Sequence, residues 1–167
     1  MTTVSVQLLN IGSNWTRPCQ KAVTTLNNLF RRHRVDVALA VNGSGGTTIT
    51  VKIDPGIQGN AVHGKTTAET NGSGKLLRAE VRLPVKVTIN TPQGVRDAGP
   101  GILEVIAGHE FVHALGHSSH NSQLMGQTMY KALGDSAAGD KLKSGGITMP
   151  PLALSPETIT ELKTIWN

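Results

Sequence analysis

The sequence predicts an α/β (α+β) fold that forms a single domain over residues 1–167. Short runs of alternating or β-branched apolar residues predict five strands, and two longer stretches with apolar residues at helical spacing predict two long helices. A glycine- and proline-rich segment, 117–154, shows neither pattern and precedes a third, C-terminal helix. A chain of 167 residues with 38% hydrophobic residues has the size and composition of one globular domain.

The first strand and the first helix follow from the spacing of apolar residues. Residues 4–8 alternate between apolar and polar, which predicts a half-buried strand. Apolar residues then recur at helical spacing over residues 18–33, which predicts an amphipathic helix. Thr16 is the expected N-cap of this helix, with Pro18 in its first turn.

Four further strands are expected before the second long helix. Residues 35–41 form a short apolar run suited to a central strand, and residues 47–53 alternate again. A short strand around residues 61–66 is expected at a sheet edge. Residues 76–89 also alternate, and Pro84 within them indicates an edge, a bulge or a strand end.

The second helix, 98–116, has the strongest helical pattern in the chain. Gly99-Pro100 opens it and Gly116 closes it. The last helix starts at Ser155-Pro156-Glu157, which supplies a cap, an early proline and an acidic residue in the first turn.

The charge distribution does not indicate a nucleic-acid-binding protein. Sixteen Lys and Arg against eleven Asp and Glu give a net charge of +5, but these charges are scattered. The one cluster, Arg31–Arg34, lies where the first helix is expected to end, and cations there interact favourably with the helix dipole. The few aromatic residues do not interleave with basic ones as they do on single-strand binding surfaces. Nucleic acid is therefore not an expected partner.

The sequence also indicates location and covalent chemistry. No window approaches the roughly 18 consecutive apolar residues of a membrane span, and the N-terminus lacks the pattern of a signal peptide. We therefore expect a protein without membrane contact that is cytosolic or released by a non-classical route. We also expect a monomer. The single cysteine, Cys19, excludes an internal disulfide.

His109, Glu110 and His113 form an HExxH pattern within the second helix. Spacing i, i+4 places two imidazoles on one face of a helix, close enough to share a zinc ion at roughly 2.0–2.1 Å. Glu110 is rotated by about 100° from His109, so it need not ligate the metal. It can instead take a proton from a zinc-bound water and pass it to a leaving amine. The pattern predicts a zinc hydrolase site.

The surroundings of the pattern favour a ligand role over that of ordinary buried histidines. Apolar residues cover most of the helix, so two histidines and a glutamate within it would be costly to bury without partners. These apolar residues are Ile102, Leu103, Val105, Ile106, Ala107, Phe111, Val112 and Leu115.

Beyond His113 the chain continues with Gly116, then His117-Ser118-Ser119-His120, and reaches Leu124-Met125. This stretch resembles the metzincin clan of zinc endopeptidases, whose signature is HExxHxxGxxH followed by a Met-turn. The resemblance implies that the glycine ends the helix and that a third histidine completes the zinc site. It also implies that Met125 lies beneath the imidazoles as a hydrophobic floor.

The order of the expected elements is also similar to that of the metzincins. The resemblance implies a twisted five-stranded mixed sheet with two long helices in an upper part, 1–116. An irregular lower subdomain with the C-terminal helix, 117–167, would then bound a substrate cleft. Residues 59–63 fall where the family has its substrate-flanking edge strand, and residues 154–166 resemble the C-terminal helix of matrixin-like members.

The third ligand departs from the family signature, because Ser119 stands where the signature has a histidine. His120 fits if the turn has one extra residue. His117 fits if the turn is two residues shorter, and it then lies eight residues before Met125, a spacing similar to that in the family. We predict His120 as the third ligand, with His117 as the alternative and an acidic residue elsewhere as a further choice.

Three other residues are weaker candidates. Tyr130 follows Met125 by five residues, whereas some metzincins place a functional tyrosine two residues after that methionine, so a packing role is expected. His63 is expected to be an exposed polar strand residue instead of a substrate contact. Cys19 is expected to be a buried thiol instead of an inhibitory cysteine.

The resemblance implies a zinc-dependent endopeptidase that binds an extended peptide or protein substrate along the sheet edge. Two alternatives remain open. If His117 and His120 both join His109 and His113, four imidazoles close the metal site, and the domain is a zinc-stabilised, non-catalytic binding or structural protein. The same residues also suit a zinc amidase that acts on cell-wall peptides.

Overall fold

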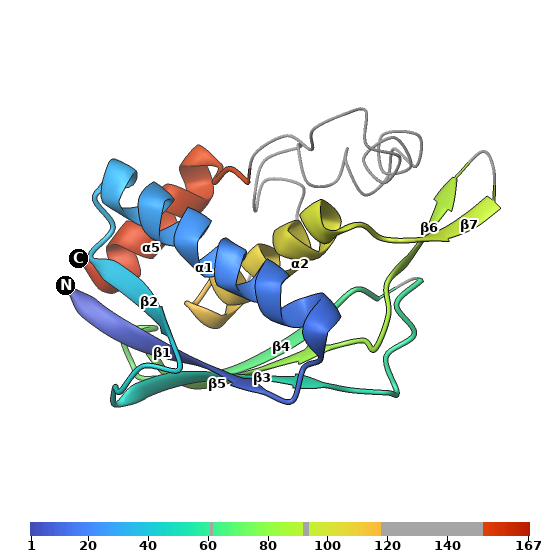
Figure 1. The fold of residues 1–167 in the computed structure, drawn as a ribbon. Coiled ribbons are helices and arrows are strands. Elements are labelled where there is room, and N and C mark those ends of the chain that lie inside the picture. Colours follow the sequence, from blue (N-terminus) through green and yellow to red (C-terminus); the bar gives the residue numbers. More distant parts are fainter. Residues whose placement is uncertain (61, 92–93, 118–151) are drawn as a thin grey trace.

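The computed structural model describes residues 1–60, 62–91, 94–117 and 152–167. These residues form a five-stranded mixed sheet, a separate two-stranded hairpin and three helices. The helices lie on the same side of the large sheet (Figure 1). The predicted α/β class with a mixed five-stranded sheet is therefore confirmed.

The bounds of the elements are as follows. The strands are β1 (Thr2–Leu9), β2 (Val37–Val41), β3 (Thr47–Ile53), β4 (Lys65–Thr70), β5 (Leu76–Leu83), β6 (Thr88–Thr91) and β7 (Gly94–Asp97). The helices are α1 (Ser13–His33), α2 (Pro100–Ala114) and α5 (Pro156–Trp166).

The large sheet has the strand order β2-β1-β3-β5-β4, so β2 is an edge strand and the prediction of a central strand at residues 35–41 is wrong. Strands β2, β1, β3 and β5 are parallel, whereas β4 pairs antiparallel with β5. The alternation in β3 places Ile49 and Val51 in the core, as period-2 patterning requires. The sheet therefore ends on one side in an antiparallel edge strand, which is the strand nearest to the candidate site.

The edge strand next to β5 was predicted in the wrong place. Residues 61–66 and 59–63 were expected there, but β4 occupies Lys65–Thr70, and Gly59 makes only an isolated parallel bridge to Val87. The side chains of β4 are exposed or half-buried throughout, so no apolar periodicity marks it in the sequence. Its three threonines and two charged residues suit a solvated edge.

Helix α1 begins five residues earlier than predicted. Its N-cap is Gly12 instead of Thr16, whose hydroxyl donates to the Gly12 carbonyl, and Pro18 lies inside the helix. The early start is explained by Trp15, which is buried and whose indole Nε1–H donates to the carbonyl of Pro84 at 2.8 Å. A proline just beyond the first turn removes only one intrahelical hydrogen bond, and the buried tryptophan offsets that loss.

Pro84 marks a strand end, which was one of the three options left open. Strand β5 stops at Leu83, directly before it. The following residues form the β6–β7 hairpin, which pairs outside the large sheet and was not predicted. By contrast, β3 has the predicted bounds, and Ser155 caps α5 by accepting from the Thr158 amide at 3.2 Å.

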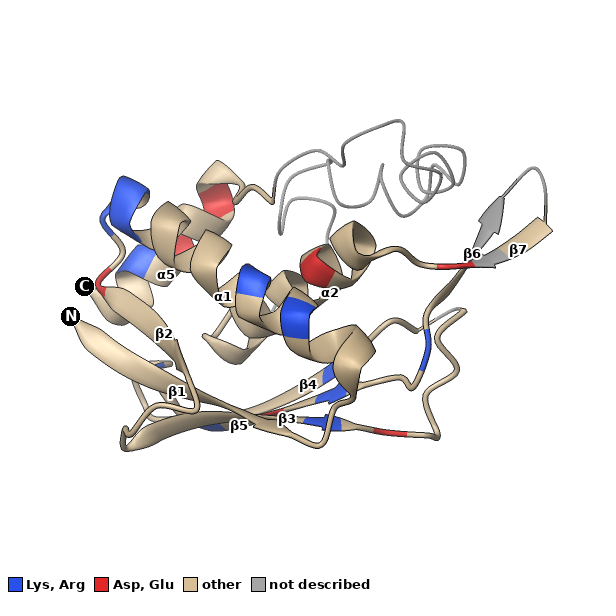
Figure 2. Cartoon of the chain, viewed as in Figure 1, with Lys and Arg blue, Asp and Glu red and all other residues tan. Residues whose placement is uncertain are grey.

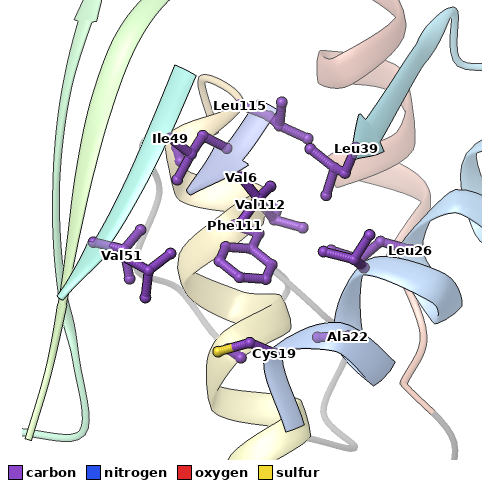
Figure 3. Packing of buried hydrophobic residues seen from close by; sticks show 14 of the residues in the cluster. Val6, Cys19, Ala22, Leu26, Leu39, Ile49, Val51, Phe111, Val112 and Leu115 are labelled. Atoms are coloured by element: carbon purple, nitrogen blue, oxygen red, sulfur yellow. The ribbon is translucent and has the colours of Figure 1, made fainter. Parts of the chain in front are cut away.

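Helix α2 is the central helix of the core. Eleven of its fifteen residues are buried, as its nearly continuous apolar pattern predicts. Figure 3 shows Phe111 of α2 between Val51 of the sheet and Leu26 and Cys19 of α1. This packing on both sides fixes the rotation of α2 and hence the direction in which its polar residues point.

Charged residues lie mainly outside this core, and basic and acidic ones are interspersed over helices and strands (Figure 2). Arg31 and Arg32 occupy the last turn of α1, as predicted, and Arg34 is its left-handed C-cap. On the sheet, exposed or half-buried ion pairs join Lys52 to Glu80, Arg78 to Glu69 and Arg82 to Asp54. None of the helices in the described part of the chain combines the length and apolarity that a membrane crossing requires.

Candidate metal centre

Helix α2 brings His109 and His113 together. Their Nε2 atoms are 3.0 Å apart, and the two rings meet edge to face with centroids 4.5 Å apart. This convergence follows from the i, i+4 spacing, which places the two residues one turn apart on the same helix face. The predicted imidazole pair is therefore present.

The hydrogen bond at the other ring nitrogen fixes the tautomer of His113. Its Nδ1 lies 2.6 Å from the backbone carbonyl oxygen of His117. A carbonyl oxygen only accepts, so Nδ1 carries the hydrogen, and in the neutral ring Nε2 presents its lone pair. His113 is 9% exposed, which makes the orientation of this ring a property of the core and not of solvent.

This pair fits a zinc ion on three counts. Two nitrogens bound tetrahedrally to one zinc at 2.0–2.1 Å lie about 3.3 Å apart, close to the observed 3.0 Å. Neutral imidazole nitrogens are among the ligands that zinc prefers. Zinc-binding histidines also donate their second ring N–H to a carbonyl or a carboxylate, as His113 does.

Glu110, which follows His109 in the same helix, is buried, with 6% of its surface exposed. The hydroxyl of Thr66 in β4 donates to its Oε2. Burial raises the pKa of the carboxyl group from its usual 4.5 to about 6, and the hydrogen bond from Thr66 partly opposes this rise. A carboxyl group with a pKa of about 6 is ionised at neutral pH and remains a competent proton acceptor.

The residues just before β4 pack against the side chain of Glu110. A Cβ atom at Gly64 would lie 2.9 Å from side-chain atoms of Glu110, so a residue larger than glycine would displace the carboxyl group. Glu110 is thereby held between its own helix and the beginning of the edge strand. No local pattern marks Gly64 or Thr66 as site residues, because their contacts with Glu110 cross more than forty positions of the chain.

Helix α2 ends at Ala114, and the chain turns at Gly116, whose φ is +113°. This turn directs His117 away from the helix line, and its Nδ1 bonds to the carboxylate of Glu161 in α5. Its Nε2 is buried and has no hydrogen-bond partner among the described residues. The ring stacks near His113 with a centroid separation of 6.2 Å.

The described residues contain no group of three or more metal-ligating side chains. His117, the alternative third ligand, therefore does not join His109 and His113 in such a group here. The predicted ligand His120, the Met-turn residue Met125 and Tyr130 fall outside the described residues.

Two weaker candidates have defined positions. Cys19 is fully buried, as predicted, and burial raises the pKa of its thiol to about 12. His63 precedes β4 and is half-buried, so its prediction as an exposed strand residue is wrong. Burial lowers the pKa of His63 because it penalises the charged imidazolium.

A scan against protein-family models found no match to this chain, and a search of curated proteins found none either.

Proposed function

We propose that this chain is a zinc-dependent endopeptidase of metzincin type. The observation that carries the proposal is the convergence of the Nε2 atoms of His109 and His113, 3.0 Å apart, on a helix that also carries the buried carboxyl group of Glu110. A pair of imidazoles supplies metal ligands, and the adjoining carboxylate supplies a base. These are the groups that metal-assisted hydrolysis of a peptide bond requires.

His109 and His113 would hold the ion, with His120 as the proposed third ligand and His117 as the alternative. A bound zinc ion supplies Lewis-acid chemistry, which polarises a substrate carbonyl and makes a coordinated water more acidic. Glu110 accepts one proton from the attacking water as the new C–O bond forms. It then delivers that proton to the amide nitrogen as the C–N bond breaks.

The edge strand β4 supports a peptide as the substrate. Among the described residues, β4 has a strand partner on one side only, and its residue Thr66 touches Glu110. An extended peptide that adds to this edge forms backbone hydrogen bonds along β4 and passes beside the carboxylate. This arrangement favours an extended chain of several residues over a small compact amide.

The test combines metal analysis with digestion of a random peptide library. We expect about one zinc ion per chain, and hydrolysis that a chelator abolishes and added zinc restores. Glu110→Ala should lower hydrolysis by about 100- to 10,000-fold, while the zinc content and the melting temperature of the zinc-loaded chain should stay almost unchanged. Loss of zinc and of the fold in this variant would instead assign Glu110 a structural role.

The same experiment separates the alternatives. Stoichiometric zinc without hydrolysis of any peptide would indicate a closed metal site in a binding or structural domain. Hydrolysis restricted to cell-wall peptides, offered beside the library, would indicate an amidase. A chain that retains no zinc would contradict all three functions.

A further inference from the structure

Helix α5 holds the turn that ends α2 at three consecutive residues. The indole Nε1–H of Trp166 donates to the carbonyl of Leu115 at 2.9 Å. Ile165 packs so closely on Gly116 that a Cβ atom there would lie 2.9 Å from its Cδ1. The carboxylate of Glu161 bonds to Nδ1 of His117. A segment 44 to 51 residues away in the sequence thus fixes the position of this turn.

The same turn carries the hydrogen-bond acceptor that orients His113. The carbonyl oxygen of His117 accepts from His113 Nδ1 at 2.6 Å. The side chain of His117 therefore anchors the turn to α5, while its backbone orients a candidate metal ligand. A continuous path of two hydrogen bonds joins Glu161 to His113 through one residue.

We infer that Glu161 is a positioning residue of the metal centre, an inference that rests on the proposed zinc function. Its carboxylate satisfies the buried Nδ1–H of His117, which is only 4% exposed. Without this acceptor, the imidazole N–H is left unpaired in the core, and the turn moves to recover a partner. The His117 carbonyl moves with the turn, and His113 loses its orientation toward the metal.

Glu161 suits experimental substitution, because 39% of its side chain is exposed. Glu161→Leu keeps a similar volume and a high helix propensity but removes the acceptor. Glu161→Gln keeps an acceptor oxygen without the charge. Glu157→Leu makes the same change at an exposed position one turn earlier in α5 and serves as the matched control.

The readouts are the zinc dissociation constant of the full chain, measured by competition with a chromophoric chelator, and the visible absorption spectrum of the chain saturated with Co²⁺. We expect Glu161→Leu to weaken zinc binding by about 10- to 100-fold, as loss of an outer-shell partner does. The zinc dissociation constant of Glu161→Gln should stay within about threefold of that of the parent, and that of Glu157→Leu should equal the parent value. At saturating Co²⁺ only the folded, loaded chain is observed, so an altered spectrum in Glu161→Leu reports ligand geometry and not stability.

Zinc binding and a Co²⁺ spectrum in Glu161→Leu equal to those of the parent would overturn the inference. Equal losses in Glu161→Leu and Glu161→Gln would also overturn it, because the acceptor oxygen would then not matter. The His113→Ala variant tests the proposed function separately. If it binds zinc as tightly as the parent, then the metal centre is elsewhere, whatever Glu161 does.

Discussion

The buried carboxyl group of Glu110 makes the free energy of unfolding of this chain depend on pH. The pKa of Glu110 is about 6 in the folded chain and near 4.5 when unfolded. Because the folded value is the higher one, the stabilising contribution is complete below about pH 4.5 and is lost as the pH rises through about 6. Ionised Glu110 therefore destabilises the zinc-free chain at neutral pH.

This argument predicts that zinc-free Glu110→Gln is more stable than the parent at pH 8. The expected gain in the free energy of unfolding is about 2 kcal/mol, which is about 1.5 pKa units at 1.4 kcal/mol each. The gain should disappear near pH 4. Urea unfolding of both chains with a chelator at several pH values measures it, and a gain independent of pH would contradict the assignment.

The two candidate third ligands differ in what their loss should do. His120→Ala should lower zinc affinity by more than about 100-fold, as should His113→Ala, because each removes a proposed direct ligand. His117→Ala removes the anchor to Glu161 but keeps the backbone carbonyl that orients His113. We expect it to lower zinc affinity by only about 10-fold. The reverse ranking of His117→Ala and His120→Ala in a chelator competition would make His117 the ligand.

Sequence reasoning was sufficient for the parts of the site that depend on local geometry. The convergence of His109 and His113 follows from helical spacing alone. Thr66 and Glu161 could not be predicted, since each meets its partner across 44 residues of sequence. A threonine on an exposed strand and a glutamate on an amphipathic helix are ordinary residues until the fold places them.

At the scale of elements, Gly116 forms the turn that ends α2 and leads to His117. Its φ of +113° is accessible to glycine and strained for other residues, and a Cβ atom there would lie 2.9 Å from Cδ1 of Ile165 and 3.2 Å from the carbonyl oxygen of Gly74. Gly116→Ala should therefore lower the free energy of unfolding by about 1–3 kcal/mol. It should also weaken zinc binding, because the turn carries the acceptor of His113.

Gly46 is the matched control for this substitution. It is exposed, has no positive φ, and a Cβ atom there would meet nothing within 4 Å. Gly46→Ala should leave stability unchanged or slightly raised, because alanine restricts the unfolded chain more than glycine does. Thermal unfolding of both variants, with and without zinc, makes the comparison. Equal effects at Gly46 and Gly116 would remove the special role of the turn.

The accuracy of the element predictions depended on whether burial left a pattern in the sequence. Strand β3 and the cap of α5 were predicted correctly, since one has a clear buried alternation and the other a local capping signal. The edge strand β4 was misplaced because it buries too few side chains to produce a period. The start of α1 was missed because the contact of Trp15 with Pro84 is tertiary.

For the whole molecule, Cys19 reports on global unfolding. It is fully buried between the helices and the sheet (Figure 3), and burial raises the pKa of its thiol to about 12. The thiolate is the reactive form, so the native chain should be inert to an aromatic disulfide reagent. Labelling should then occur only from the unfolded state, at a rate set by the stability of the fold.

Zinc should slow this labelling if the metal binds the native state at the proposed site. Ligand at 100 times its dissociation constant stabilises a fold by about 2.7 kcal/mol, which corresponds to about 100-fold slower labelling. His113→Ala should label at the same rate with and without zinc. Glutathione, labelled under the same conditions, controls for direct binding of zinc to thiols. If zinc slows labelling equally in the parent and in His113→Ala, then it stabilises the chain at another site. If Cys19 of the native parent is labelled rapidly, then the core around α2 opens without global unfolding.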